Sequence, residues 1–135
     1  MNQSDVLEQA KQLRNDPKVH YNCAQAVFWP FARGQGLTDE AALAITANFG
    51  AGMRAGLTCG AITGGLMALG LCGAGDPTDA QEFLRKMRAN HEGMSACSEL
   101  LAANAKTGRP KKAHCDDMVY EAVELVDAML RERGA

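Results

Sequence analysis

The chain has 135 residues, a length that suits one ordinary domain able to bury a core without covalent staples. Its formal net charge of −2 argues against a nucleic-acid partner, because such a partner favours a basic face. Aromatic residues make up only 5% of the chain, whereas Ala, Leu and Met are common. We therefore expect an all-α fold, a single-domain helical bundle over residues 1–135.

The first half of the chain predicts three helices. Residues 4–13 place their apolar side chains on one side, as an amphipathic helix does. A second helix should begin with Asn22 as its cap and Cys23 just inside, and Pro30 should kink or end it. A third helix should occupy residues 38–49, with the threonine at its start as the cap.

The longest uncharged span, residues 58–72, predicts a central helix around which the rest of the bundle packs. Thr58 should cap it and Cys59 should lie in its first turn. Gly60 and Gly64 form a small-residue row that lets another backbone approach closely. About 15 helical residues span roughly 22 Å, which is too short for a bilayer core, so we expect no membrane segment.

Three more helices are expected in the second half. One should begin at a capping box formed by Thr78 and Gln81. A short helix should follow, with Ser95 as its cap and Cys97 in its first turn. The last helix should open near Cys115 and carry an apolar stripe to the end of the chain.

Other candidate binding features are weaker. The glycine-rich residues 50–57 lack the Gly-Lys-Ser/Thr of a P-loop and follow no strand, so we expect a close backbone approach beside Cys59 instead. The basic residues 106–112 are expected to form a solvated loop. His20 and His114 could hydrogen-bond a thiolate or replace one as ligand, although ordinary surface or capping roles are favoured.

The cysteines carry the chemical signal. Four of the five are expected at helix starts, whereas Cys72 falls at a helix end. A helix N-terminus carries about half a positive charge, so it should lower the pKa of a thiol and favour the thiolate. The competing interpretation is that these are ordinary small core residues. No C-x-x-C is present, so any site must be assembled by the tertiary fold.

The first residues, MNQSDVLEQAKQL, show no basic-then-apolar signal pattern, so we expect a cytoplasmic protein. In that compartment, cysteines are more often free, metal-bound or redox-active than bridged in structural disulfides.

Around the cysteines, the chain reads Asn22-Cys23-Ala24-Gln25, Cys59-Gly60-Ala61-x-x-Gly64-Gly65, Cys97-x-Glu99-Leu100-Leu101 and then Cys115. This pattern resembles the C_GCAxxG_C_C family of redox-active proteins over nearly the whole chain, although the central motif here reads C-G-A-x-x-G. The resemblance implies a small, mainly helical redox protein, and a domain of this type also occurs attached to a cytochrome with an associated iron centre. It implies no known substrate. The functional positions that it assigns are Cys23, Cys59, Cys97 and Cys115, without Cys72.

Three functions remain open. The first is an iron–sulfur centre, preferably [2Fe–2S], held by Cys23, Cys59, Cys97 and Cys115 and used for electron transfer or redox sensing. Its partner would be an electron donor or acceptor protein. The second is a cofactor-free thiol–disulfide oxidoreductase, and the third is a structural zinc protein with the same ligands. No catalytic residue is assigned, enzyme activity is left open, and a homodimer is compatible with the glycine rows.

Overall fold

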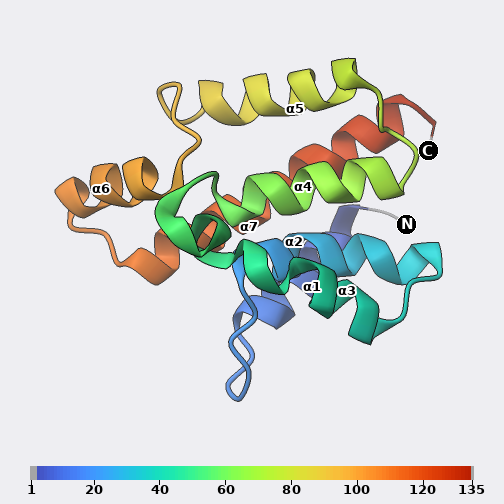
Figure 1. The fold of residues 1–135 in the computed structure, drawn as a ribbon, viewed down its shortest axis with the longest axis horizontal. Coiled ribbons are helices and arrows are strands. Elements are labelled where there is room, and N and C mark those ends of the chain that lie inside the picture. Colours follow the sequence, from blue (N-terminus) through green and yellow to red (C-terminus); the bar gives the residue numbers. More distant parts are fainter. Residues whose placement is uncertain (1–2, 135) are drawn as a thin grey trace.

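The computed structural model describes residues 3–134, and this part of the chain is all-α, as the sequence predicts (Figure 1). Within it lie seven α-helices: α1 (Gln3–Arg14), α2 (Cys23–Ala32), α3 (Asp39–Thr46), α4 (Gly60–Leu71), α5 (Pro77–Ala89), α6 (Cys97–Thr107) and α7 (Lys111–Glu132). Short 3₁₀ turns follow α2 and α3, at Arg33–Gln35 and Ala47–Phe49, and a π-turn spans Gly52–Gly56. The described residues contain no strand, only one isolated antiparallel bridge between Thr58 and Ala96.

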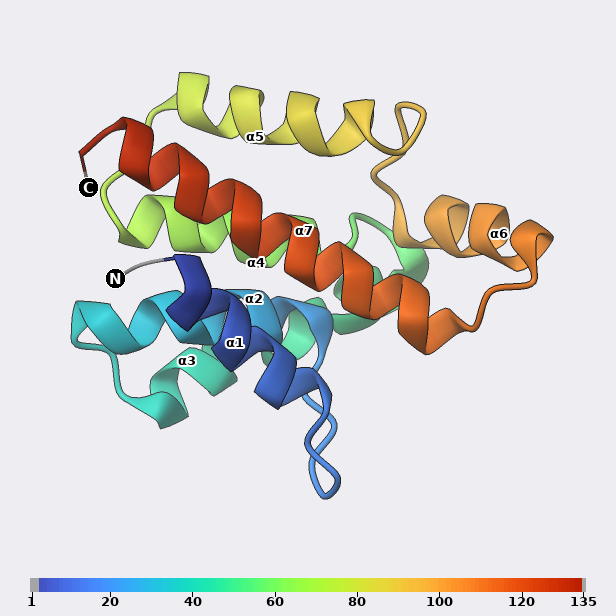
Figure 2. The same cartoon turned by 180° about the vertical axis from the view of Figure 1, so that it is seen from behind.

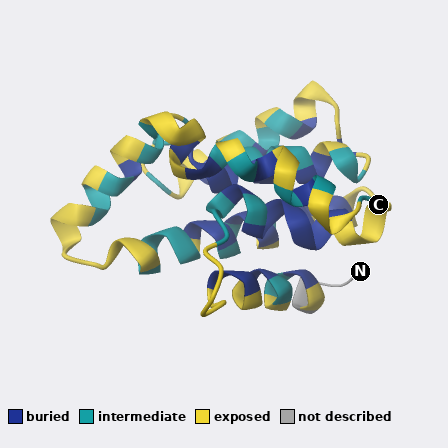
Figure 3. Ribbon diagram, turned by 60° about the horizontal axis from the view of Figure 1, so that its bottom comes forward, coloured by how far each residue is buried: buried dark blue, intermediate teal, exposed yellow. Residues whose placement is uncertain are grey.

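Helices α2, α4 and α7 pack against one another at the centre of the bundle. Helix α1 covers α7 and α2, α3 lies on α2, and α5 covers α4 (Figures 1 and 2). Buried residues gather in the middle of the molecule, with exposed residues along the outer helices (Figure 3). Helix α6 projects from one end of the bundle, and its only buried residue is Leu100. No described helix combines the length and apolarity needed to cross a membrane.

Glycines let α4 approach α2 closely. A Cβ added at Gly64 would lie 2.8 Å from the carbonyl oxygen of Ala24, and one at Gly60 would lie 3.2 Å from the Ala24 nitrogen. The first distance is shorter than real Cβ atoms show, and the second is tighter than most real Cβ contacts. The contact between these two helices therefore depends on residues without a side chain, and it fixes the start of α4 beside the start of α2.

Several predicted helix boundaries are correct. Asn22 caps α2 through a capping box with Gln25, and Thr38 caps α3 by accepting the N–H of Ala41. Pro30 does not end α2 at its own position, since the helix continues to Ala32. A proline removes one backbone donor, but the surrounding side chains are buried, and packing keeps the last turn helical.

Three predicted caps are wrong. Thr58 does not cap α4, because its backbone pairs with Ala96 and the cap position passes to Cys59. The capping box at Thr78 does not form, since α5 begins one residue earlier at Pro77, whose fixed φ suits a first helical position. Ser95 does not cap α6 either, and its carbonyl accepts the N–H of Cys59 instead.

Helix α7 also begins earlier than the sequence predicts. It starts at Lys111 rather than near His114, so the end of the basic segment is helical. Cys115 consequently lies one turn inside α7 and not at its first turn. The misassignment has a physical cause, because lysines are unfavourable at the positive end of a helix and Pro110 normally signals a break.

Candidate functional site

The four cysteines singled out by the sequence line one pocket of about 340 Å³ at the end of the bundle from which α6 projects. Cys23 is the first residue of α2, Cys59 is the N-cap of α4 and Cys97 is the first residue of α6. Cys115 reaches the same pocket from α7. Cys72 is the C-cap of α4 and lines a different pocket. The fold thus brings together four segments that are far apart in the sequence.

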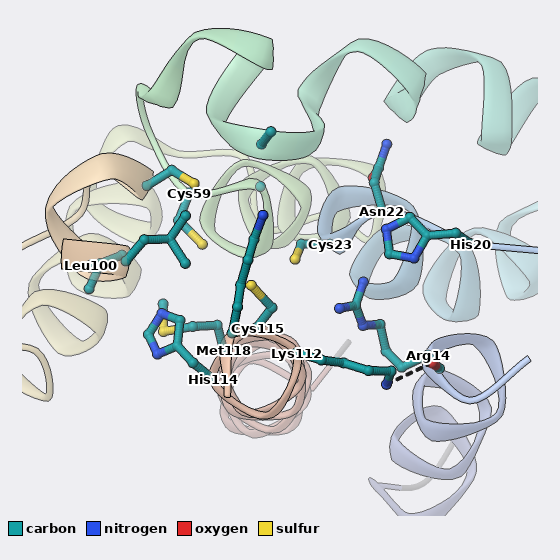
Figure 4. A pocket seen from close by; sticks show the side chains of 15 residues that line it. Arg14, His20, Asn22, Cys23, Cys59, Leu100, Lys112, His114, Cys115 and Met118 are labelled. Carbon is teal, nitrogen blue, oxygen red and sulfur yellow. Dashed lines mark hydrogen bonds between the residues drawn. The ribbon is translucent and has the colours of Figure 1, made fainter. Parts of the chain in front are cut away.

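Cys23 and Cys115 form one pair. Their side chains lie close together in the pocket (Figure 4), and each thiol shifts the pKa of the other. When Cys115 is ionised, a hydrogen bond from the Cys23 thiol raises the pKa of Cys23 and lowers that of Cys115. Cys23 therefore stays protonated, and Cys115 is the thiolate.

Cys59 and Cys97 form a second pair, and the bridge between Thr58 and Ala96 positions it. Each cysteine directly follows one of the two bridged residues. The N–H of Cys59 donates to the carbonyl of Ser95 at 2.9 Å, and the N–H of Cys97 donates to the carbonyl of Leu57. In an antiparallel pair, residues at these two positions are diagonal neighbours on one face. Each thiol also interacts electrostatically with Cys115, which joins the two pairs.

The glycine-rich loop before α4 folds against the second pair. A Cβ at Gly52, where φ is +65°, would lie 2.6 Å from the Leu57 nitrogen and 2.8 Å from the Cys97 Cβ. The expected close backbone approach beside Cys59 is present, and it is the backbone of Gly52 that lies against Cys97. Ala51, Met53 and Arg54 have φ between 52° and 58°, a left-handed conformation that costs roughly 1–3 kcal/mol for each such residue. The loop is strained where it borders the pocket.

The prediction that helix termini lower the pKa of all four thiols is wrong for three of them. Burial raises the pKa of Cys59 to about 11, even though the backbone N–H groups of Ala61 and Ile62 act in the lowering direction. Burial also raises the pKa of Cys97. Only Cys115 has a lowered pKa, about 6, owing to the hydrogen bond from Cys23 and then to Arg14 and Lys111. Loss of hydration outweighs the half charge of a helix end at these buried positions.

Cations surround the thiols. Arg14, Lys111 and Lys112 all line the pocket, and among the described residues no Asp or Glu does. Arg14 is only 8% exposed, and its Nε donates to the Asp116 carboxylate at 2.7 Å. Lys112 binds the other oxygen of that carboxylate at 2.8 Å. The pocket is therefore electropositive, which favours anionic sulfur within it.

Sequence reasoning missed Arg14, although a signal was available. Val6, Ala10 and Leu13 mark the buried stripe of α1, and Arg14 follows four residues after Ala10 on that stripe. A basic residue at a core position needs a buried acidic partner, and no such partner is evident nearby in the sequence. The partner, Asp116, is 102 residues away.

The two candidate histidines lie at the pocket, whereas His91 and Arg54 lie elsewhere. His20 and His114 both line the pocket, and burial lowers the pKa of His114, which favours the neutral ring. His91 instead contacts Glu121 at 2.9 Å. Arg54 is exposed and donates to the Ala47 carbonyl.

Within the described residues, no group of three or more His, Cys, Asp and Glu side chains is arranged to hold a metal ion. The thiols lie as two pairs around one cavity rather than converging on a point. All four donors are sulfur atoms, the ligand type of iron–sulfur clusters and of structural zinc.

These features define a small all-α domain with four thiols in one electropositive pocket. Residues 21–129 match the family described as "Putative redox-active protein (C_GCAxxG_C_C)". The match covers most of the chain, and the chain belongs to this family. No curated protein and no solved structure shows significant similarity to it.

Proposed function

We propose that this protein is a redox protein whose four-cysteine pocket holds an iron–sulfur centre, of the [2Fe–2S] type. The observation that carries the proposal is the arrangement of the thiols as two pairs, Cys23 with Cys115 and Cys59 with Cys97, around one cavity. A dinuclear centre takes four cysteines for two irons, or two thiolates for each iron. Two pairs suit this ligand requirement better than they suit a single ion.

The charge of the pocket supports the same proposal. By formal count, an oxidised [2Fe–2S] centre with four thiolates carries roughly −2. Arg14, Lys111 and Lys112 line the pocket and can offset that charge, together with the helix starts of α2, α4 and α6. These cations also favour loss of the thiol protons, which burial alone opposes.

When bound, such a centre supplies one-electron redox chemistry, which serves electron transfer or redox sensing. The residues of the chain would hold it and restrict its contact with water. Cys59 is 7% exposed, whereas Cys23, Cys97 and Cys115 are half-buried and lie nearer the surface. An electron donor or acceptor protein would approach the pocket over these three thiols.

The test is to purify the protein without oxygen and measure its iron, its acid-labile sulfide and its visible spectrum. We expect stoichiometric iron and sulfide, a thiolate-to-iron absorption band, and a paramagnetic signal after one-electron reduction. If neither iron nor sulfide is retained after anaerobic reconstitution, the iron–sulfur proposal is wrong.

A second function, cofactor-free thiol–disulfide exchange, is favoured by the proximity of Cys23 and Cys115 in the pocket and by the lowered pKa of Cys115. The Cys115 thiolate would attack a substrate disulfide, forming a mixed disulfide and releasing one substrate thiolate. Cys23 would then attack the Cys115 sulfur and release the second, and its proton would pass to a leaving thiolate. Two electrons leave the protein, which ends with a disulfide between Cys23 and Cys115. This function predicts a redox-active disulfide in protein that contains no metal.

A structural zinc site is the third alternative. One zinc ion requires four donors at a single point, an arrangement that the described His, Cys, Asp and Glu side chains do not show. Metal analysis of the purified protein separates this alternative as well, because zinc without sulfide would support it.

A further inference from the structure

Arg14 occupies an unusual place for a charged residue. It lies at the end of α1, outside the segment that matches the family, and it is nearly buried. Its guanidinium is fixed at two points, by Nε donating to Asp116 at 2.7 Å and by Nη1 donating to the Tyr21 carbonyl at 2.9 Å. A planar group anchored twice has little freedom to turn away from the pocket that it lines.

The anchors tie Arg14 to both members of the first cysteine pair. Tyr21 is two residues before Cys23, and Asp116 directly follows Cys115. Burial alone would lower the pKa of Arg14, but interaction with Cys23, and then with Asp116 and Cys115, more than offsets this effect and raises it. Arg14 therefore stabilises negative charge on either sulfur atom of the pair.

The acid beside Arg14 is itself shared. Lys112 binds Asp116 at 2.8 Å and the Arg14 carbonyl at 3.1 Å, so two cations face one carboxylate. Arg14, Lys112 and Asp116 together carry one net positive charge beside the Cys23–Cys115 pair. The Arg14 side chain is 4% exposed and that of Lys112 is 58% exposed, so the field of Arg14 is screened less than that of the surface lysine.

We infer that Arg14 is a positioning residue that holds positive charge against the Cys23–Cys115 side of the site and thereby raises its reduction potential. The inference rests on the proposed redox function. Reduction adds negative charge to an iron–sulfur centre, and it produces thiolate in a dithiol, so a fixed cation stabilises the reduced form in either case. Asp116 opposes Arg14 electrostatically while holding it in place.

The experiment compares Arg14→Gln with Asp116→Asn in protein prepared as the wild type is, with reduction potential as the readout. Arg14→Gln should shift the potential to more negative values, and Asp116→Asn should shift it to more positive values. A purely structural role predicts that both variants lose stability and move the potential in the same direction. Shifts of the reduction potential in opposite directions in the two variants would therefore identify an electrostatic role.

Arg33→Gln is the matched control, because it removes the same charge from an exposed arginine at the other end of α2. Its potential should stay close to that of the wild type. Arg14→Lys keeps the charge but loses the planar fork, and it should shift the potential less than Arg14→Gln. If Arg14→Gln does not fold, Asp116→Asn still tests the sign of the charge effect through its expected positive shift.

Shifts of the same sign in the Arg14 and Asp116 variants, or an Arg14→Gln shift no larger than that of Arg33→Gln, would overturn the inference and leave the proposed function standing. A wild-type protein with neither a reducible centre nor a redox-active disulfide would overturn both.

Discussion

Gly64 in α4 faces Ala24 in α2 so closely that a Cβ on the glycine would lie 2.8 Å from the alanine carbonyl oxygen. One turn earlier, a Cβ at Gly60 would lie 3.3 Å from the Cβ of Cys23. The spacing between these two helices therefore also sets the distance between Cys23 and Cys59 across the pocket. The close packing of α2 against α4 therefore also determines where the thiols of Cys23 and Cys59 lie.

We predict that Gly64→Ala lowers the free energy of unfolding by about 1–3 kcal/mol, because the new methyl group meets backbone rather than a flexible side chain. The gain in helix propensity, up to about 1 kcal/mol, is too small to compensate fully. Urea denaturation followed by circular dichroism measures the change.

Gly70→Ala is the matched control for this prediction, since it lies in the same helix and a Cβ there would meet nothing within 4 Å. It should be neutral or stabilising by up to about 1 kcal/mol. Equal losses in the two variants would show that the glycines do not act through the contact between the helices.

Much of the fold could be predicted from local signals. Asn22 and Thr38 cap helices because their side chains accept a backbone N–H of the first turn, an interaction that depends on a few adjacent residues. The failures at Thr58 and Ser95 have a common source. Both residues belong to the two segments joined by the bridge between Thr58 and Ala96, and a pairing across that distance leaves no local signature.

The site was only partly predictable, for a related reason. The cysteine motifs indicate which thiols belong together, but the pairing of Cys23 with Cys115 depends on how α2 meets α7. The pKa directions also depend on burial, which the position of a residue along its helix does not give. Arg14 was missed because its partner is distant in the sequence.

We predict that Cys59→Ala abolishes bound iron or redox activity, whereas Cys72→Ala leaves both nearly intact. Cys59 lines the pocket and caps α4, while Cys72 lies at the other end of that helix beside Phe31 and Leu130. Iron and sulfide content of the two variants, prepared in parallel, is the measurement. Comparable loss in both would mean that the four functional thiols have been assigned incorrectly.

In reduced protein without cofactor, we predict that Cys115 is the most reactive thiol at neutral pH. Its pKa of about 6 lies below its ordinary value, so the thiolate persists until the pH falls through about 6 and is lost below it. Cys59, with a pKa of about 11, should react slowly at the same pH. Site-resolved alkylation with iodoacetamide as a function of pH measures both.

Cys23→Ala tests the cause of that reactivity, because it removes the thiol that donates to Cys115. The midpoint of Cys115 alkylation should move to higher pH in this variant. An unchanged midpoint would assign the low pKa to the nearby cations instead.

We predict that removing the cofactor lowers the melting temperature and speeds amide exchange in α4 and α6. Helix α4 has many glycines, so it gains little stability from helix propensity, and α6 buries only Leu100, so it gains little from packing. A group bound to the folded state alone stabilises both through Cys59 and Cys97. Hydrogen exchange of residues 58–72 and 97–107, with and without the cofactor, provides the comparison. A melting temperature that changes with thiol reductant but not with iron and sulfide would support the dithiol function.

The pairing of Cys23 with Cys115 has a consequence for biosynthesis. Their two helices are separated in the chain by α3, α4, α5 and α6, so the first pair cannot close until nearly all of the domain has been synthesised. Domains generally fold as units, and here the ligand set becomes complete only with the last helix. A cofactor that uses all four thiols can therefore reach its complete set of ligands only after α7 has been synthesised.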